Sequence, residues 1–596
     1  MDQENMESAL NLAMESSKEM RERSDVLGVG YDETTDRWEI IIKYNGNLEE
    51  TLEQGITLEP LIAGYGILTV PDSLLEDVPP NPQIEYAELP KRLYFEQETE
   101  RGMEQGIDGL TGQDILHRES GGVDAKEVPG TDGLTGRGVL IAIIDSGIDY
   151  TLANFHNTDG TTRIAALWDQ TLTPDEANPP PQGFAQGRLF TKDQINDALR
   201  LAIPWAAVPS ADTSGHGTAV AGIAASRRME GEYAGIAPES ELLIVKLGNP
   251  ADKGFPRTTE LLRALTFSVR FTFARNQPLV VNLSFGNSYG SHNGTSLLER
   301  FIDNVSEIGR TVICIGTGNE GLSGGRCSGW LKEGQVTEVE IQAAAYEANL
   351  SIQFWKNFVD EYDLRLAAPN GDSLIISPGQ QKRTEGILGN TKALVFAGQP
   401  TPYSTNQEIY FDLLPEAYYI DEGVWRLFIE PKSIRNGFFY LYLPVASTRN
   451  QGTRFLNPSL EMTLTIPSTA ARTVAVSACH PLTGVFADFS GRGAVSLDQF
   501  QEKSNIGAAR PTIAAPGVDI MAPAAGGGYA SFTGTSFATP FVTGRAALLM
   551  EWGILRGHDY FLYGEKLKAE LIRAACPVPG IETYPSEKVG FGRLCP

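Results

Sequence analysis

The stretch from Gly534 to Pro540, GTSFATP, runs directly into FVTGRAALLMEW, an apolar segment with helical periodicity. Its glycine and small hydroxyl residues allow a tight turn, so we expect Ser536 in the first turn of a buried helix. Free N–H groups and the helix dipole there favour negative charge on its oxygen. A serine hydroxyl is a weak nucleophile, so chemistry at Ser536 requires a general base, a group that orients this base, and an oxyanion donor.

Residues elsewhere in the chain can supply these three groups. Asp145 ends the apolar run VLIAIID, which predicts a buried strand with a carboxylate at its C-terminal end, where active groups of α/β sheets lie. His216 stands between glycines in SGHGTAVAGIAA, before an Ala-rich helical pattern. Asn319 lies in GTGNEG, just after another apolar run. We therefore expect His216 to be the base, Asp145 its orienting group and Asn319 the oxyanion donor.

Each of these residues also has an ordinary structural explanation. Asp145 could cap a strand end, His216 could be a satisfied polar residue in a glycine turn, and Asn319 could form a turn. Ser536 could be a helix N-cap. Singly these explanations are favoured, but all four would have to coincide in one chain.

Strand and helix patterns alternate from the Asp145 strand to Asn319, which predicts an α/β fold with a parallel sheet covered by helices on both faces. Short alternating strands then follow, separated by turns such as PNGD at 369–372, and no helical pattern competes with them. This pattern favours an inserted antiparallel β-sandwich or jelly roll. The nucleophile helix belongs to the α/β pattern that resumes after the insert.

The N-terminal part predicts a separate acidic α+β unit. Strands are expected at 37–46, 62–71 and 83–95, and helices at 48–56 and 72–79. Residues 1–24 have the spacing of an amphipathic helix, for which a solvated position is favoured over docking. The predicted domains are 1–97 for this unit, 98–329 and 467–596 for the two parts of the α/β domain, and 330–466 for the insert.

The charge balance excludes several classes of protein. The net charge is −27, so no basic surplus is available to neutralise nucleic acid or an anionic membrane. No apolar stretch approaches the roughly 18 residues of a membrane helix. The N-terminus lacks the basic and apolar regions of a signal peptide, which predicts a protein inside the cell or spore.

The cysteines and acidic residues indicate no cofactor. The five cysteines are scattered and form no C-x-x-C pair, which argues against a disulfide framework or zinc site and favours a reducing compartment. The acidic residues contain no D-x-[DN]-x-[DN]-G calcium loop. We predict no metal and no other cofactor.

Six motifs occur together in one order: IIDSGID, GHGTAVAG, NLSFG at 282–286, GTGNEG, AAPGVDI at 514–520 and GTSFATP. In this order they resemble the subtilisin-like serine proteases. The resemblance implies the subtilisin fold and a serine endopeptidase with the triad Asp145, His216 and Ser536. It also implies that the backbone of Ser284, Phe285 and Gly286 pairs with an extended polypeptide substrate.

The domain order, with an N-terminal α+β unit and a jelly-roll insert, resembles the Csp proteases of spore-forming bacteria. This resemblance implies a ferredoxin-like prodomain that assists folding, is cut by the enzyme itself near Gln97, and stays bound in the cleft. The mature protease would then activate a precursor cortex-lytic hydrolase during germination. Two alternatives stay open: a non-hydrolytic regulatory or scaffold subtilase silenced by its bound prodomain, and a chain in which the β-sandwich is the functional binding module.

Overall fold

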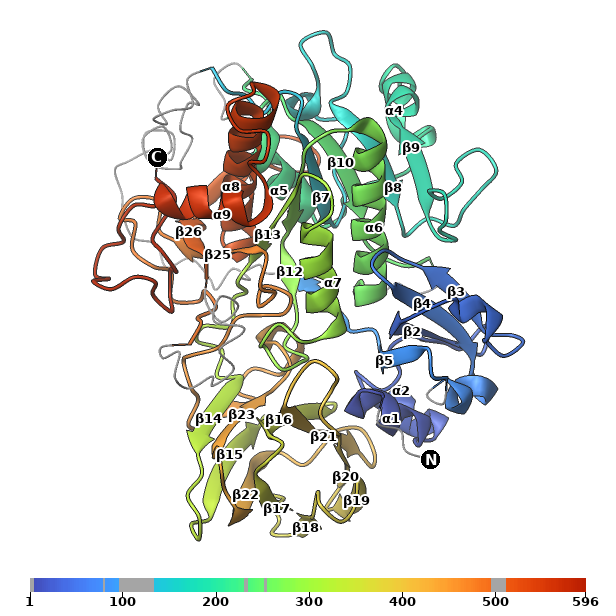
Figure 1. Cartoon of the computed structure of the whole chain (residues 1–596), viewed down its shortest axis with the longest axis vertical. Helices are drawn as coiled ribbons and strands as arrows, with labels where there is room; N and C mark the ends of the chain where they lie inside the picture. Colours follow the sequence, from blue (N-terminus) through green and yellow to red (C-terminus); the bar gives the residue numbers. More distant parts are fainter. Residues whose placement is uncertain are drawn as a thin grey trace.

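The computed structural model describes residues 5–78, 81–95, 133–229, 234–250, 254–494 and 511–595. These residues form an α/β body, a β-sandwich and a smaller N-terminal unit (Figure 1). In Figure 1 the α/β body occupies the upper half, the sandwich lies beneath it, and the N-terminal unit fills the angle between them.

An eight-stranded sheet in the order β26-β25-β13-β11-β7-β10-β8-β9 forms the centre of the α/β body. All its neighbours are parallel except the β8–β9 pair. The strands are β7 (Leu140–Asp145), β8 (Ile164–Asp169), β9 (Arg188–Thr191), β10 (Glu241–Lys246), β11 (Leu279–Leu283), β13 (Thr311–Gly316), β25 (Val474–Cys479) and β26 (Ile513–Pro516). The predicted parallel α/β sheet is confirmed.

Helices cover both faces of this sheet. Along β7 the side chains alternate, so that Ile141 and Ile143 join one apolar cluster and Leu140, Ala142 and Ile144 join the other. The first cluster includes α5 (His216–Ala225) and α8 (Thr535–Met550), and the second includes α6 (Thr258–Arg275) and α7 (Leu297–Ser306). The shorter α4 (Lys192–Leu199) and α9 (Gly564–Arg573) lie nearer the ends of the sheet. The central strands are therefore buried on both sides.

The insert consists of two antiparallel sheets packed face to face. One sheet contains β14 (Arg326–Trp330), β23 (Phe438–Tyr442), β16 (Leu350–Asn357), β21 (Asn406–Pro415), β20 (Thr391–Ala397) and β19 (Arg383–Leu388). The other contains β18 (Ser373–Ile376), β17 (Glu361–Ala367), β22 (Gly423–Ser433), β15 (Thr337–Ala343) and β24 (Arg454–Phe455). Aromatic side chains such as Phe354, Phe411 and Trp425 fill the space between them.

The N-terminal unit is an antiparallel sheet with little regular helix between its strands. Its strands are β1 (Tyr31–Asp32), β2 (Arg37–Tyr44), β3 (Thr57–Pro60), β4 (Tyr65–Pro71) and β5 (Ile84–Glu88). The two helices predicted between strands are only 3₁₀ segments, η1 (Leu48–Glu50) and η2 (Asp72–Asp77). Both predicted helices are shorter than about 12 residues, a length at which an α-helix is marginal on its own.

The first residues correct another expectation. They form α1 (Ser8–Met14) and α2 (Lys18–Arg23), and α1 is buried rather than solvated. Leu10, Leu12 and Ala13 have no exposed surface, and they pack in one cluster with the N-terminal sheet and with Leu394 and Phe396 of β20. The helix is docked because the insert supplies a second apolar surface, which local periodicity does not reveal.

One disulfide joins Cys576 to Cys595, while Cys314, Cys327 and Cys479 are free and buried. The scattered cysteines argue against a disulfide framework, and this single pair is not expected from them. Reciprocal backbone hydrogen bonds between Cys576 and Arg593, both 2.8 Å, bring the two segments together. No sequence spacing signals this contact.

Candidate active site

The fold brings Asp145 and His216 into direct contact. Asp145 is the last residue of β7, and His216 is the first residue of α5. The Nδ1–H of His216 donates to Asp145 Oδ1 at 2.7 Å, and both side chains are almost completely buried. Figure 1 shows α5 beside β7, near the centre of the α/β body. This contact fixes the ring orientation and the tautomer of the histidine.

Glycines around His216 make this approach sterically feasible. Gly215 has φ 77°, a conformation that disfavours other residues. A Cβ on Gly217 would lie 2.2 Å from the carbonyl oxygen of Gly147. The glycines on both sides of the histidine therefore serve the close packing of α5 on the β7 turn.

Sequence reasoning missed Asp212, which supports this arrangement. Its Oδ2 accepts from Thr218 N at 2.8 Å and from Thr218 Oγ1 at 2.7 Å, at the start of α5. Its Oδ1 accepts from Ser146 Oγ at 2.8 Å, and Ser146 Oγ accepts from Gly217 N at 2.9 Å. A carboxylate at a helix N-terminus is favourable, and the acidic residue four positions before the histidine was an available signal.

Ser536 lies in the first turn of α8, as predicted, and is completely buried. Its hydroxyl donates to the carbonyl oxygen of Ser284 at 3.0 Å, and Ser284 Oγ donates to the Ser536 carbonyl oxygen at 3.0 Å. Within the described part of the chain, His216 Nε2 has no hydrogen-bond partner. The structure therefore joins Asp145 to His216 but turns the Ser536 hydroxyl to Ser284.

Asn319 lies just after β13, beside the start of α8. Its Oδ1 accepts from Thr535 N at 3.1 Å and from Thr535 Oγ1 at 3.2 Å. Its Nδ2 group is buried and has no partner among the described residues. The amide is thus oriented by its oxygen, and its donor group remains available next to the Ser536 turn.

The chain's own N-terminal unit lies on the candidate substrate strand. Strand β6 (Tyr94–Phe95) pairs antiparallel with β12 (Phe285–Gly286), in the register Phe95 to Phe285 and Tyr94 to Gly286. Residues Ser284 and Phe285 have no exposed surface in this arrangement. The segment that should accept a polypeptide is therefore paired with polypeptide. Gln97, the expected cleavage position, lies outside the described residues.

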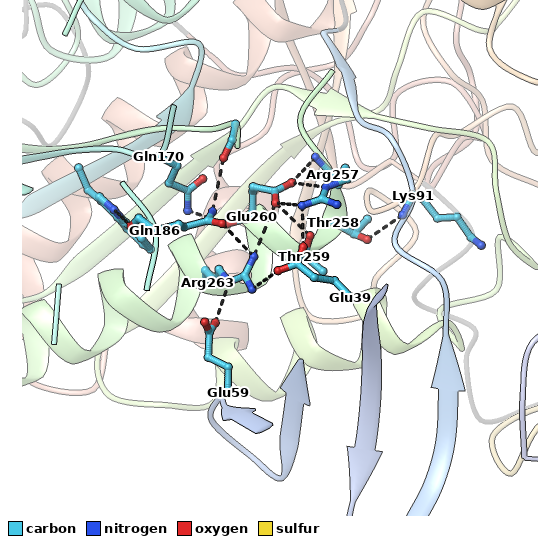
Figure 2. A network of polar contacts seen from close by, with 12 residues as sticks. Glu39, Glu59, Lys91, Gln170, Gln186, Arg257, Thr258, Thr259, Glu260 and Arg263 are labelled. Atoms are coloured by element: carbon cyan, nitrogen blue, oxygen red, sulfur yellow. Dashed lines mark hydrogen bonds and ion pairs between the residues drawn. The ribbon is translucent and has the colours of Figure 1, made fainter. Parts of the chain in front are cut away.

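An ion-pair network holds the N-terminal unit against α6 (Figure 2). Arg263 Nη2 contacts Glu39 Oε1 at 2.5 Å, and Arg263 Nε contacts Glu59 Oε1 at 2.7 Å. Arg257 Nη2 contacts Glu39 Oε2 at 2.6 Å and Glu260 Oε1 at 2.7 Å. Glu39 and Glu59 come from the N-terminal sheet, whereas the other three residues lie at or in α6.

The network is buried, so its charges depend on one another. Arg257, Glu260 and Arg263 are each at most 6% exposed. Burial opposes ionisation of Glu39, but Arg263 and Arg257 outweigh it and lower the pKa of Glu39 to about 2. Burial raises the pKa of Glu59 despite the attraction of Arg263. Glu39 is therefore the carboxylate that α6 holds most firmly in its charged form.

A second polar cluster lies in a cavity where the three bodies meet. Lys91 contacts Glu7 at 2.7 Å, and two further carboxylates, Glu88 and Glu408, line the same cavity. Burial and then repulsion from Glu7 raise the pKa of Glu88 to about 8 and that of Glu408 to about 7. Glu299 of α7 also repels Glu88.

This cluster predicts that the assembly loses stability as the pH rises. Because the pKa values of Glu88 and Glu408 are raised from 4.5, these two carboxyl groups hold more protons in the folded chain than in the unfolded chain up to about pH 8. In Ser536→Ala protein, we expect the urea concentration at the unfolding midpoint to decrease as the pH is raised from 6 to 9. Adding Glu88→Gln to this protein should make the decrease smaller, as urea unfolding at each pH measures. An equal decrease in both proteins would contradict the prediction.

Two features are absent from the described residues. They contain no group of three or more His, Cys, Asp or Glu side chains arranged to hold a metal ion. In the same ranges no helix has the length and apolar character needed to cross a membrane.

The α/β body has a parallel sheet with helices on both faces. It carries an aspartate at a strand end, and a histidine and a serine that each lie at the start of a helix. Together these features define a subtilisin-like α/β fold. The chain belongs to the subtilase family: the subtilase family model matches residues 136–376 and 424–592. A second model, the Csp protease B prodomain, matches residues 4–91. These matches confirm both the predicted family and the Csp resemblance.

Individual relatives agree with this assignment. The solved structure of the CspB protease of Clostridium perfringens is 33% identical, covers 78% of this chain and 92% of its own, and has a TM-score of 0.70. An intracellular serine protease of Paenibacillus polymyxa is 25% identical over 332 residues, 54% of this chain and 84% of that protein. A PI-type proteinase of Lactococcus lactis subsp. cremoris is 23% identical over 486 residues; they span 73% of this chain but 23% of the proteinase.

Proposed function

We propose that Asp145, His216 and Ser536 are the catalytic triad of a serine endopeptidase. The observation that carries this proposal is the buried 2.7 Å hydrogen bond between His216 Nδ1 and Asp145 Oδ1, with Ser536 in the first turn of the neighbouring helix α8. A buried aspartate on Nδ1 leaves Nε2 as the basic nitrogen of a neutral imidazole. The unpartnered Nε2 supports this role.

Catalysis begins when the Ser536 hydroxyl turns from the Ser284 carbonyl to His216 Nε2. His216 then takes the hydroxyl proton as the oxygen attacks a peptide carbonyl, and Asp145 stabilises the imidazolium that forms. The Nδ2 of Asn319 and the backbone N–H of Ser536 donate to the tetrahedral oxyanion. His216 next protonates the leaving amine, and water repeats the sequence to release the acyl group.

Replacing Asn319 by alanine should lower turnover about 10²–10³-fold, the loss that removal of one oxyanion donor causes in a subtilisin. Two hydrogen bonds from Thr535 to Asn319 Oδ1 orient the side-chain amide. The Nδ2 group is therefore already in position to donate to the oxyanion, and alanine removes this donor. Peptide hydrolysis by purified protein measures the effect. Thr535→Ser keeps the orienting hydroxyl and serves as the control; a similar loss there would attribute the effect to disturbed packing.

We further propose that residues 1–97 are a prodomain that the enzyme cuts near Gln97 and retains. The prodomain match over residues 4–91 and the pairing of β6 with β12 support this proposal. Ser284, Phe285 and Gly286 would then hold the product end of the prodomain in the position of a polypeptide substrate.

Wild-type protein should divide near Gln97 into a fragment of about 97 residues and the remainder, whereas Ser536→Ala should stay whole. Intact-mass measurement of the two purified proteins reports the outcome. If both stay whole, self-processing is wrong; if both are cut at one place, another protease is responsible.

The resemblance to the Csp proteases favours a precursor cortex-lytic hydrolase, activated during spore germination, as the physiological substrate. The similarity to the CspB protease over most of both chains supports this choice. Incubating the processed enzyme with such a precursor tests it, because cleavage must depend on Ser536 and must release lytic activity.

A second candidate is a regulatory or scaffold subtilase silenced by its prodomain. The buried Ser536 and the tail paired with β12 favour this state for the intact chain. The two candidates differ once the prodomain is removed: a latent protease then hydrolyses peptides, whereas a scaffold does not.

A further inference from the structure

Two side chains of the N-terminal tail contact aromatic groups of the protease. The Phe95 ring lies 4.8 Å from the His216 ring between centroids, tilted by 34°. The Tyr94 ring lies 4.7 Å from the ring of Phe255 in an edge-to-face arrangement at 61°. These distances fall within the range in which aromatic pairs attract one another. Each tail ring thus has its own aromatic partner on the protease.

The backbone of the tail is held on two sides. Residues 94–95 pair with 285–286, and just before them Leu93 N donates to Pro256 O at 2.7 Å and Thr258 N donates to Lys91 O at 2.8 Å. Main-chain hydrogen bonds of this kind accept nearly any sequence, because every residue except proline carries the same backbone groups. Selectivity in such a site must therefore come from the side-chain contacts.

The two aromatic contacts differ in whether catalysis requires the protease residue that makes them. Phe95 lies on the histidine of the candidate triad, which the reaction itself requires. Phe255 has no such requirement: it stands in the loop just before α6 and is 50% exposed although it covers Tyr94, which is 7% exposed. An apolar ring left half in solvent beside a polypeptide strand contributes little to the protease core, but it does shape the site that Tyr94 fills.

We propose that Phe255 is a specificity-determining residue, and that the cleft selects polypeptide substrates with two consecutive aromatic residues where Tyr94 and Phe95 lie. This inference rests on the proposed endopeptidase function. The tail then acts as a copy of the preferred substrate sequence, read by Phe255 at one position and by the face of His216 at the next.

Self-cleavage of the full chain after refolding from urea tests the first position. Tyr94→Ala and Phe255→Ala should each slow fragment formation about tenfold, and the double variant should be no slower than either single one. Tyr94→Phe keeps the ring and should match wild type. Lys18→Ala is the control in the same N-terminal unit, because its ion pair with Glu22 is exposed and contributes little.

Cleavage of a peptide mixture, produced by digesting casein with trypsin, tests the selection in trans. Wild type, processed and freed of its prodomain, should yield products with aromatic residues enriched at two consecutive positions before the cut, as read by mass spectrometry. Phe255→Ala should lose the enrichment at the first of these positions only. A merely structural role of Phe255 would lower the total yield without changing the sequence preference.

The outcomes separate the two levels of the proposal. Ser536-dependent cleavage with unchanged rates in Tyr94→Ala and Phe255→Ala, or without aromatic enrichment, overturns the selection and leaves the endopeptidase function standing. No Ser536-dependent cleavage of the tail or of any peptide overturns both.

Discussion

Asp145→Asn should lower turnover about 10⁴-fold while the protein still folds. The replacement has the same shape, but it removes the charge that stabilises the imidazolium. An asparagine can also donate to Nδ1, which would shift the proton of the neutral ring to Nε2. His216 could then no longer accept the Ser536 proton. Rates of self-cleavage and of peptide hydrolysis measure the loss, and urea unfolding verifies the fold.

Asp212→Asn is the matched control for this prediction. Asp212 caps the same helix through Thr218 but does not touch the imidazole. We expect a loss of stability of about 0.5–2 kcal/mol, as for other helix caps, with turnover changed less than about tenfold. If both variants lost activity equally, Asp145 would act only by holding α5 in place.

The candidate site could be predicted because each of its residues follows a strong local pattern. Asp145 ends a continuous apolar strand, while His216 and Ser536 follow tight glycine turns and precede apolar helices. Neighbouring residues determine where strands end and helices begin, so the positions of the candidate catalytic residues can be predicted without knowledge of the fold. The orientation of the Ser536 hydroxyl toward Ser284 was not visible, because it depends on a contact between two distant segments.

The interfaces between the bodies could not be predicted for the same reason. Glu39 and Arg263 are 224 positions apart, and in a sequence each is an ordinary charged residue of the kind found on surfaces. The docked helix α1 likewise depends on β20, whose residues come almost 400 positions later. Local periodicity predicts which face of an element is apolar, but it does not say what covers that face.

Arg263→Ala should release the prodomain from the processed enzyme. The substitution leaves Glu59 without its ion pair, and Glu39 and Glu260 with only Arg257 to compensate them. Removing one partner from a buried ionic network costs about 3–5 kcal/mol, so the dissociation constant of the prodomain should rise about 10²–10³-fold or more. Gel filtration of the processed protein measures whether the two fragments still co-elute.

Release should also change activity, because the tail that pairs with β12 leaves together with the prodomain. Peptide hydrolysis should therefore rise in Arg263→Ala above the level of the processed wild type. Arg275→Ala, in the last turn of the same helix, is the control: its ion pair with Glu241 is partly exposed, and its loss should cost less than about 1 kcal/mol. Unchanged co-elution and unchanged hydrolysis in Arg263→Ala would show that apolar packing alone holds the prodomain.

A neutral version of the network separates charge from shape. Combining Arg263→Met with Glu39→Gln and Glu59→Gln leaves fewer unpaired charges, so the affinity for the prodomain should return most of the way toward wild type.

In wild type, acid should release the prodomain through Glu39. Because the pKa of Glu39 is lowered to about 2, its contribution to prodomain binding is complete above about pH 4.5 and is lost as the pH falls toward 2. The neutral version should lack this acid-induced release, since its side chain at position 39 does not titrate.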